Sequence, residues 1–446
     1  MLKGLFDKKG SDPKTQSEAK QSNVQETPKK PGRAPRSKSK VWTIELFPVE
    51  VQEGKSRFHD LNLETPLLHA IADLKFEYCS EIQAETLPHT LAGHDVIGKA
   101  QTGTGKTAAF LVSIINDLLR RPIPDTDRYA SEPRALIIAP TRELAMQIEK
   151  DALLLTKYVD LSVYSVLGGI DYQKQKNHVR NSVIDILVAT PGRLIDFLNS
   201  QDLYLDQLDF LVIDEADRML DMGFIPDVKR IISRCSKVHQ RQTLLFSATF
   251  SEDVLNLAKR WTTNPVYIEV EAEQMTTDTV DQKIFMVPTE EKLEIICRYL
   301  DVNNVKKAIV FGNRRDETRR LESTLKSKGI RAALLSGEVP QHKRIKTLDQ
   351  FKNGQIDILV ATDVAGRGIH VDGVSHVFNY NLPEDPEDYV HRIGRTGRAG
   401  ETGVSISFAC EDDAFLLPDI EKYIGMKLNC EYPDYLLGKT ETGKGS

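Results

Sequence analysis

The sequence predicts an α/β protein with two tandem domains, each a mostly parallel sheet with helices on both faces, plus a disordered N-terminal tail. Short β-branched runs alternate with helical stretches along most of the chain, which is typical of the βα units that build parallel sheets. The string DILVAT occurs at 185–190 and again at 357–362, within two similar series of strands and helices. This repetition indicates a duplication. The chain has 446 residues, 40% of them hydrophobic, which suits two globular cores.

The first 40 residues differ in composition from the rest of the chain. They are rich in Lys, Ser, Pro and Gln, and their 11 basic and 4 acidic residues give a net charge of +7. Since the whole chain carries −6, the remainder carries −13, and it lacks the strongly basic balance typical of nucleic-acid-binding domains. The tail is expected to be disordered. It is either a solubilising spacer or a basic arm that contacts RNA or a partner.

Six short apolar runs predict buried strands in the first domain, and six more predict strands in the second. The first set is VIGKA, ALIIAP, VYSVLG, DILVAT, FLVID and TLLFSAT; the second is IFMV, AIVFGN, AALLSG, DILVATD, HVFNYNLP and VSISFA. KTAAFLVSIINDLLR and TRELAMQIEKDALLLTKY predict helices. The expected divisions are a tail over 1–40, a first domain over 41–270, a linker over 271–282, a second domain over 283–430 and a C-terminal tail over 431–446.

Composition also excludes several classes of protein. The five cysteines are scattered and form no Cys-x-x-Cys pair, which argues against a disulfide framework or a zinc site and favours a reducing cytoplasm. No apolar run approaches the length of a membrane span. The first residues, MLKGLFDKKG, lack the apolar block of a secretory signal.

The stretch AQTGTGKT, residues 100–107, follows a predicted strand and opens a predicted helix. It has the form of a phosphate-binding loop, except that Ala100 occupies the place of the usual first glycine. Gly103 and Gly105 allow backbone N–H groups to face phosphates, Lys106 can reach the β and γ phosphates, and the Thr107 hydroxyl can bind Mg²⁺. Gln101, Thr102 and Thr104 complete the predicted loop.

Two further stretches fit the hydrolysis of ATP. FLVIDEADR places Asp214 and Glu215 at the end of an apolar strand. Asp214 can hold the water shell of Mg²⁺, and Glu215 can orient and deprotonate an attacking water. HRIGRTGR, residues 391–398, lies in the second half of the chain and is either a solvated basic loop or a source of arginine fingers for the γ-phosphate. The second reading requires the two domains to meet around ATP.

The motifs together resemble the DEAD-box RNA helicases. Those that carry the resemblance are FHDL…IQ, AQTGTGKT, PTRELA, GG, TPGR, DEAD, SAT, ATDVAGRGIH and HRIGRTGR, in the family's order over about residues 56–410. In this family Ala at the start of the phosphate loop is ordinary. The resemblance implies two RecA-like domains and an ATP-dependent RNA helicase that locally unwinds short RNA duplexes with RNA-stimulated ATP hydrolysis. A helicase acting on DNA and an ATP-gated RNA clamp are the alternatives.

The resemblance also implies roles for single residues. Phe58 would pack on the adenine and Gln83 would read it through a bidentate amide contact, while Asp363 belongs to the nucleotide-binding set. Arg395 and Arg398 match the arginine fingers. The positions that match contacts to the RNA backbone are Arg142, Gly169, Thr190, Arg193, Arg344 and Thr362.

Four more residues would couple hydrolysis to the grip on RNA. These are Ser247 and Thr249 of SAT, with Asp217, which is expected to hydrogen-bond across the domain interface to His391. Three positions depart from the wider family's pattern. Lys75 replaces a Gly and Cys79 replaces a Pro in the adenine-reading segment, and His370 replaces an Asp that usually meets the ribose.

Other details, among them VWTIELF, YCSEIQ and WTTNP, resemble a bacterial subfamily of these helicases. That likeness implies an RNA-decay assembly with RNase E in the cytoplasm, and a monomer outside this assembly.

Overall fold

The computed structural model describes residues 42–100, 103–270, 280–337, 339–366, 371, 373–397 and 402–437. The predicted basic tail, most of the predicted linker, and the candidate residues Gln101, Thr102, His370 and Arg398 lie outside these ranges. The chain divides into two units, Met1–Trp42 and Thr43–Ser446.

The first sheet has seven parallel strands, in the order β3-β4-β2-β5-β6-β1-β7. The strands are β1 (Val96–Lys99), β2 (Ala135–Ile138), β3 (Val163–Val166), β4 (Ile186–Ala189), β5 (Phe210–Ile213), β6 (Gln242–Ser247) and β7 (Val266–Glu269). The six predicted strands are confirmed. The sequence analysis missed β7, because it is a short edge strand with only Ile268 buried and therefore lacks a continuous apolar run.

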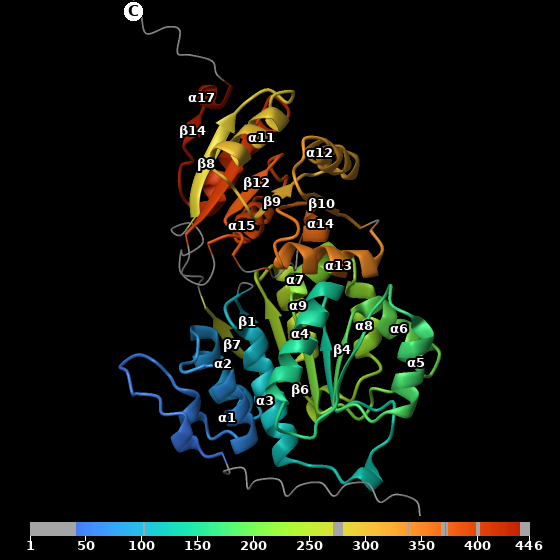
Figure 1. Ribbon diagram of the computed structural model, residues 1–446. Helices are drawn as coiled ribbons and strands as arrows, with labels where there is room; N and C mark the ends of the chain where they lie inside the picture. The colour runs from blue at the N-terminus through green and yellow to red at the C-terminus, as the bar shows by residue number, and fades with distance from the viewer. Residues whose placement is uncertain are drawn as a thin grey trace, which may run out of the picture. The chain divides into compact units, whose positions relative to one another are not determined.

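Helices cover both faces of this sheet (Figure 1). They are α1 (Thr65–Asp73), α2 (Glu81–Leu91), α3 (Lys106–Arg120), α4 (Arg142–Leu155), α5 (Tyr172–Asn181), α6 (Pro191–Asn199), α7 (Ala216–Asp221), α8 (Ile225–Ile232) and α9 (Glu252–Trp261). One face packs against α5 to α9, and the other against α2, α3 and α4. Short 3₁₀ turns lie at Ile44–Leu46, Phe58–Leu61, Asp125–Asp127 and Val238–Gln240.

The second sheet repeats the plan of the first. Its strands are β8 (Val280–Met286), β9 (Ala308–Phe311), β10 (Ala332–Leu335), β11 (Ile358–Ala361), β12 (His376–Asn379), β13 (Gly403–Ala409) and β14 (Cys430–Glu431). Their order is β10-β11-β9-β12-β13-β8-β14, again all parallel, which is the order of the first sheet with every strand number raised by seven. The two copies of DILVAT form the equivalent strands β4 and β11. The duplication is therefore confirmed.

Two apolar layers fix the helices of the second sheet. The helices are α11 (Lys292–Val302), α12 (Arg315–Ser327), α13 (Gln341–Lys352), α14 (Asp363–Gly366), α15 (Pro386–Ile393), α16 (Leu417–Ile424) and α17 (Asp434–Leu437), with a 3₁₀ turn at Ala414–Leu416. Side chains of α11, α12 and α17 pack on one face. Phe351 of α13 and Tyr389 and Ile393 of α15 pack on the other.

Two predicted boundaries shift in the structure. Strand β8 begins at Val280, so residues 280–282 belong to the second sheet and not to a linker. Glu431 lies in β14, and Leu436 is buried against α11, so the second domain extends past the predicted start of the C-terminal tail. A lone apolar residue in a polar segment gives little sequence signal, and only its packing shows that the segment is ordered.

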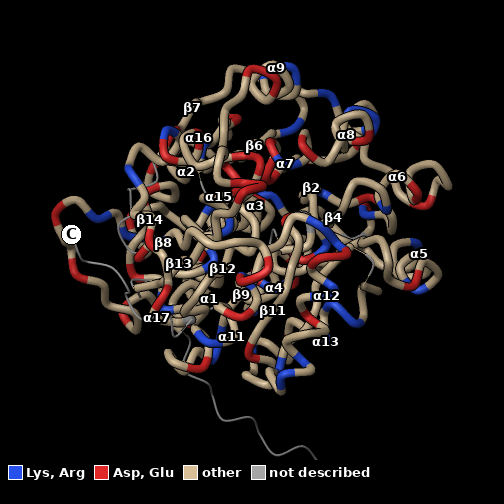
Figure 2. Tube along the Cα trace, turned by 90° about the horizontal axis from the view of Figure 1, so that it is seen from above, with Lys and Arg blue, Asp and Glu red and all other residues tan. Residues whose placement is uncertain are grey.

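Charge is dispersed over the surface. Figure 2 shows basic and acidic residues interspersed along the helices of both domains. Among the described residues, no helix is both long enough and apolar enough to cross a membrane.

Candidate active site

The phosphate loop follows β1 and begins beside the SAT segment. Ala100 is buried, and its N–H donates to the Ser247 carbonyl at 2.9 Å. Gly103 and Gly105 have φ of 98° and 96°, in the left-handed region that favours glycine. A Cβ at Gly105 would also lie 2.5 Å from Gln83 Nε2, so this position requires glycine on two grounds. Helix α3 then begins at Lys106, as the sequence predicts.

Gln83 is tied to this loop. Its Oε1 accepts from the Ser80 N–H at 2.9 Å, and its Nε2 donates to the Gly105 carbonyl at 3.0 Å. The amide therefore braces the N-terminus of α2 against the phosphate loop. One N–H and one lone pair of the amide remain for a ligand, so its contact with adenine stays a prediction.

Phe58 does not reach the cavity in which a base would lie. It is completely buried and stacks on Phe76, with ring centroids 6.4 Å apart. Phe76 is partly exposed and lines the cavity. The predicted packing of Phe58 on adenine therefore does not fit its burial, and Phe76 holds the accessible position. Its place in the same segment, seven residues before Gln83, was the available sequence signal.

Two of the three departures from the family pattern have structural consequences. Lys75 stands where the family has Gly, and its φ of 58° is in the left-handed region, so a non-glycine residue is strained there. Cys79 stands where the family has Pro, and its N–H donates to the Ser56 carbonyl at 2.8 Å, a bond that Pro could not form. His370, the third, lies outside the described residues.

A cavity of about 240 Å³ adjoins the phosphate loop. Its polar lining includes Gly103, Gly105, Lys106, Thr107, Gln83, Gln147 and Asp151, and its apolar lining includes Leu74, Phe76, Leu144, Leu154 and Leu155. Glycines, a lysine and a hydroxyl suit phosphates. Aliphatic and aromatic side chains suit a base.

Lys106 and Asp214 form a buried ion pair. Lys106 Nζ lies 3.1 Å from Asp214 Oδ1, and the side chains are 4% and 0% exposed. Burial alone would lower the pKa of Lys106, but the carboxylates of Asp214 and Glu215 raise it above its ordinary value. Burial raises the pKa of Asp214, and Lys106 offsets part of that rise. Among the described residues, Asp214 Oδ2 has no hydrogen-bond partner, and Lys106 Nζ contacts Asp214 Oδ1 with a single one of its three N–H groups, so both side chains can serve a ligand.

Glu215 is held as an ionised carboxylate at the start of α7. Its φ is 54°, which for a non-glycine residue stores about 1 kcal/mol or more of strain. Its Oε2 lies 2.5 Å from Arg218 Nη1. Burial acts to raise the pKa of Glu215, but Arg218, Lys106 and Arg395 lower it to about 2. Sequence reasoning missed Arg218, although it directly follows the DEAD residues.

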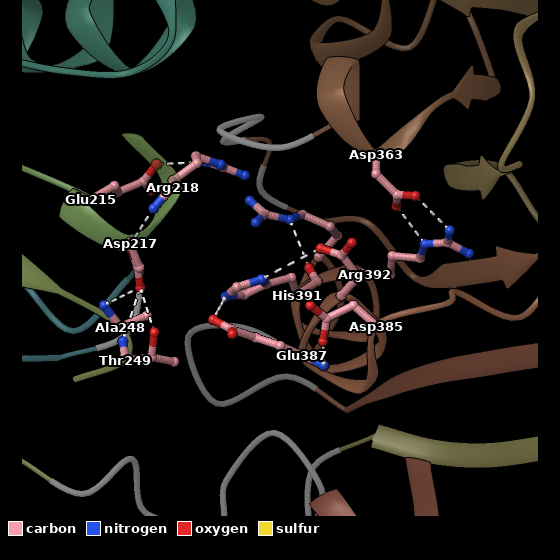
Figure 3. Close-up of polar contacts among 12 residues, drawn as sticks. Glu215, Asp217, Arg218, Ala248, Thr249, Asp363, Asp385, Glu387, His391 and Arg392 are labelled. Atoms are coloured by element: carbon pink, nitrogen blue, oxygen red, sulfur yellow. Dashed lines mark hydrogen bonds and ion pairs between the residues drawn. The ribbon is translucent and has the colours of Figure 1, made fainter. Parts of the chain in front are cut away.

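Asp217 stabilises the SAT segment of its own domain. Its Oδ2 accepts from the N–H groups of Ala248 and Thr249 at 2.8 and 2.9 Å and from Thr249 Oγ1 at 3.4 Å (Figure 3). Its own N–H donates to Ser247 Oγ at 3.1 Å. The predicted hydrogen bond from Asp217 to His391 is absent from the described contacts. The carboxylate is instead occupied by nearer backbone donors, which no sequence pattern reveals.

Residues of both domains line one pocket at this point. They are Glu215, Asp217, Arg218, Asp221 and Ala248 from the first domain and Glu387, His391 and Arg395 from the second. Arg395 is buried, and its Nε–H donates to the His391 carbonyl at 3.0 Å. Its charge lowers the pKa of Glu215, so the two groups are within electrostatic reach. The structure thus brings the predicted finger Arg395 to the predicted base Glu215.

Asp363 is bound within the second domain. Arg392 Nε and Nη2 donate to its two carboxylate oxygens at 2.6 and 2.7 Å (Figure 3). The remaining N–H groups of Arg392 donate to Asn313 Oδ1 at 2.7 Å, the Asn381 carbonyl at 2.7 Å and Asn379 Oδ1 at 3.5 Å. All five N–H groups of Arg392 therefore have an acceptor, and the residue joins α15 to the strand ends and to Asp363. Each oxygen of Asp363 keeps a lone pair, so its contact with the nucleotide stays a prediction. Arg392 was not among the residues predicted from the sequence.

A second cavity, of about 290 Å³, collects most of the residues predicted to hold an RNA backbone. Arg142, Thr190, Arg193 and Arg344 all line it. Gly169 lies against Arg142, because a Cβ there would be 2.5 Å from Arg142 Nη1. Arg193 Nε and Nη1 are buried and have no hydrogen-bond partner among the described residues.

Thr362 is not part of that cavity lining. Its carbonyl accepts from the Ala365 and Gly366 N–H groups at the start of α14. Glu143 and Gln341, which the sequence analysis did not single out, join the domains instead. Glu143 Oε1 accepts from Arg344 Nε at 2.8 Å and Gln341 Nε2 at 3.2 Å, and Gln341 Oε1 accepts from Arg142 Nη1 at 3.1 Å.

Two duplicated RecA-like domains with a phosphate loop, a buried Lys–Asp pair and an arginine from the second domain define a two-domain nucleoside-triphosphate-hydrolysing enzyme. Residues 80–257 match the DEAD/DEAH box helicase family, and residues 291–400 match the helicase conserved C-terminal domain. The chain belongs to the DEAD-box ATP-dependent RNA helicases.

Named relatives agree with the bacterial subfamily expected from the sequence. The ATP-dependent RNA helicase RhlB of Pseudomonas aeruginosa (strain UCBPP-PA14) is 59% identical over 385 residues, which cover 86% of this chain and 97% of that protein. RhlB of Shewanella baltica (strain OS155 / ATCC BAA-1091) is 48% identical over 375 residues, covering 84% and 85%. S. cerevisiae Dbp5 bound to RNA and ADP BeF3 has a TM-score of 0.75 and 29% identity, covering 86% of this chain and 98% of that one.

Proposed function

We propose that this helicase locally unwinds short RNA duplexes and that RNA stimulates its ATP hydrolysis at a site shared by the two domains. The single observation that carries the proposal is the pocket in which Glu215 of the first domain and Arg395 of the second lie within electrostatic reach. A base and an arginine finger on separate domains hydrolyse ATP only when the domains close. RNA bound across both domains would favour that closed state.

ATP and Mg²⁺ are the proposed cofactors. The described residues contain no group of three or more His, Cys, Asp or Glu side chains suited to hold a metal. Mg²⁺ fits nonetheless, because it commonly uses one or two protein oxygens plus phosphates and waters. The unpartnered Asp214 Oδ2 and the Thr107 hydroxyl are the candidate oxygens. When bound, the ion would neutralise charge on the phosphates.

The roles of the chain's own groups follow from their environment. Lys106 carries a charge in a buried site and would hold the β and γ phosphates. Glu215, with its pKa lowered to about 2, is ionised and would orient the attacking water as a hydrogen-bond acceptor. Arg395 would stabilise the charge that develops on the γ-phosphoryl group. Arg398 is proposed as the second finger from the resemblance alone.

RNA backbone binding is proposed for the second cavity. Unpartnered N–H groups on a buried guanidinium are costly, and a phosphate oxygen would satisfy those of Arg193. Arg142 and Arg344 add two cations to the same cavity. Contacts of this kind recognise phosphates and riboses without reading bases, so binding should be largely independent of sequence.

Coupling between the two sites is proposed to run through Asp217. Its carboxylate fixes the SAT segment. In that segment the Ser247 hydroxyl accepts from the Asp217 N–H, and the Ser247 carbonyl accepts from the Ala100 N–H of the phosphate loop. Closing of the domains would bend one bound strand, and a paired strand could not follow the bend. Phosphate release would then reopen the site.

Two substitutions test the proposal. Glu215→Gln should keep ATP and RNA bound and abolish turnover, whereas Lys106→Ala should weaken both nucleotide binding and hydrolysis. ATPase rates are measured with and without RNA, with single-stranded DNA as the comparison, alongside release of a labelled RNA strand from a short duplex. Wild-type-like turnover by Glu215→Gln would overturn the assignment. Stimulation by DNA equal to that by RNA, or RNA binding without strand release, would favour the two alternatives.

Domain division and cellular setting are also proposals. A first domain over 41–270 and a second starting near 280 should hydrolyse ATP poorly when mixed unlinked. The subfamily likeness suggests a cytoplasmic RNA-decay assembly with an RNase E-type partner and a monomer outside it. Recovery of such an endonuclease in a pull-down from the native cytoplasm tests this, and its absence from the recovered proteins would refute it.

A further inference from the structure

The nucleotide cavity contains a carboxylate that the hydrolysis of ATP does not use. Asp151 lies in the third turn of α4 and lines the cavity together with Lys106 and Thr107 of the phosphate loop. Of the side chains that line the cavity in the described part of the chain, Lys106 and Asp151 carry the charges. One cation and one anion thus share the space that receives a polyanionic nucleotide.

The position of Asp151 is defined by contacts within α4. Its Oδ1 accepts from Gln147 Nε2, one turn earlier, at 2.8 Å. Its Oδ2 accepts no hydrogen bond from a described residue. Burial raises the pKa of Asp151, and Gln147 and Lys150 offset part of this rise. A half-buried carboxylate without a paired cation is costly unless a ligand supplies a donor.

The adenine base is the part of ATP that can face Asp151. A carboxylate repels phosphates, so Asp151 cannot serve the end that Lys106 and the loop glycines hold. The cavity's apolar lining, Phe76 with Leu74, Leu144, Leu154 and Leu155, suits the flat faces of a purine. The 6-amino group of adenine then offers two N–H donors, and the Gln83 amide can accept only one of them.

We propose that Asp151 accepts a hydrogen bond from the 6-amino group of ATP and so selects adenine over guanine. Guanine has a carbonyl oxygen at that position, which would face the carboxylate acceptor to acceptor. The phosphate loop holds only phosphates and cannot distinguish the two nucleotides. This inference rests on the proposed binding of ATP in the cavity, and it adds to Gln83 a second base-selecting residue, which lies outside the motifs.

The test removes each partner of the proposed hydrogen bond in turn: the Asp151 side chain from the protein, and the 6-amino group from the nucleotide. Binding of ATP, GTP and purine riboside triphosphate, which lacks the 6-amino group, is measured by displacement of a fluorescent ADP derivative. Wild-type protein should prefer ATP to purine riboside triphosphate by about tenfold, the value of one hydrogen bond to a charged group. Asp151→Ala should reduce this preference to the part that the Gln83 contact supplies. Asp151→Asn, whose amide can turn an N–H toward guanine, should narrow the ratio of ATP to GTP affinity.

Glu149→Gln is the matched control, because Glu149 lies on the same helix, accepts from Ser165 and does not line the cavity. It should retain the wild-type preference. Thermal melting and nucleotide-free RNA binding show that each variant is folded. An undiminished preference in Asp151→Ala would overturn the proposal, and so would a wild-type protein that binds ATP and purine riboside triphosphate equally. If the wild-type protein shows no RNA-stimulated ATP hydrolysis, the proposed function is refuted instead. The nucleotide-displacement assay would still measure the effect of Asp151 on base preference, because it does not depend on hydrolysis.

Discussion

Arg344 of the second domain donates its Nε–H to Glu143 Oε1 of the first at 2.8 Å, across 201 residues of sequence. Both side chains are 9% exposed, and both residues line the cavity proposed for RNA. The ion pair therefore joins the two domains. It also partly neutralises the charge of Arg344, which is proposed to bind RNA phosphates. An RNA backbone that enters the cavity meets an arginine that already has a partner.

The first prediction follows from this pair. Glu143→Gln keeps an acceptor for Arg344 and Gln341 but removes a negative charge, so RNA binding without nucleotide should tighten by up to about tenfold and become more salt-dependent. Fluorescence anisotropy of a labelled single-stranded RNA at two salt concentrations measures this. Glu149→Gln on the same helix, where Glu149 accepts from Ser165 at 2.7 Å, is the control. Equal RNA affinities for the two variants would contradict the prediction.

The second prediction concerns the finger. Arg395→Ala should reduce kcat by about 10³-fold, because a lost arginine finger typically costs 10³ or more. ATP binding should change far less, since Lys106 and the phosphate loop remain. Steady-state ATPase kinetics with saturating RNA separate the two effects. Arg320→Ala removes an exposed arginine whose ion-pair partner is Asp316, and it should leave kcat unchanged. If Arg395→Ala changes kcat no more than Arg320→Ala does, Arg395 takes no part in the reaction.

The third prediction concerns Asp217. Asp217→Asn replaces the carboxylate, whose Oδ2 accepts from the Ala248 and Thr249 N–H groups, with an amide. The amide has one acceptor oxygen instead of two. The free energy of unfolding should fall by about 1–3 kcal/mol. Strand release per ATP hydrolysed should fall more than hydrolysis itself, because the SAT segment is no longer fixed. Chemical denaturation and a combined ATPase and strand-release assay measure the two effects, and parallel losses of both activities would count against a coupling role.

The fourth prediction concerns pH. Burial lowers the pKa of His391, Arg395 and Arg218 lower it further, and Glu387 and Asp217 oppose this. The unfolded chain therefore binds a proton at His391 more readily than the folded chain, and stability must fall as pH drops through the ordinary histidine range near 6.5. Melting temperatures between pH 5.5 and 7.5 should decline more toward low pH in the wild type than in His391→Gln. Identical pH profiles would show that His391 does not titrate in this way.

The sequence determined the parts of this protein that depend on neighbouring residues. Twelve of the strands follow from short β-branched runs, and the repeat of DILVAT revealed the duplication before any sheet order was known. The phosphate loop followed from its glycines, because positive φ at Gly103 and Gly105 is a local requirement. The meeting of Arg395 with Glu215 could also be anticipated, but only through the resemblance to a family.

Only the tertiary structure decided which partner each side chain meets. Phe58 and Phe76 are equally apolar in sequence, yet packing buries one and leaves the other at the cavity. Asp217 contacts the SAT segment rather than His391, and Asp363 accepts from Arg392. Burial and hydrogen-bond partners depend on elements far apart in the chain, whereas periodicity and turn chemistry depend on adjacent residues. For that reason the sequence predicted the sheets and the phosphate loop, while the tertiary structure was needed to place Asp151 beside that loop.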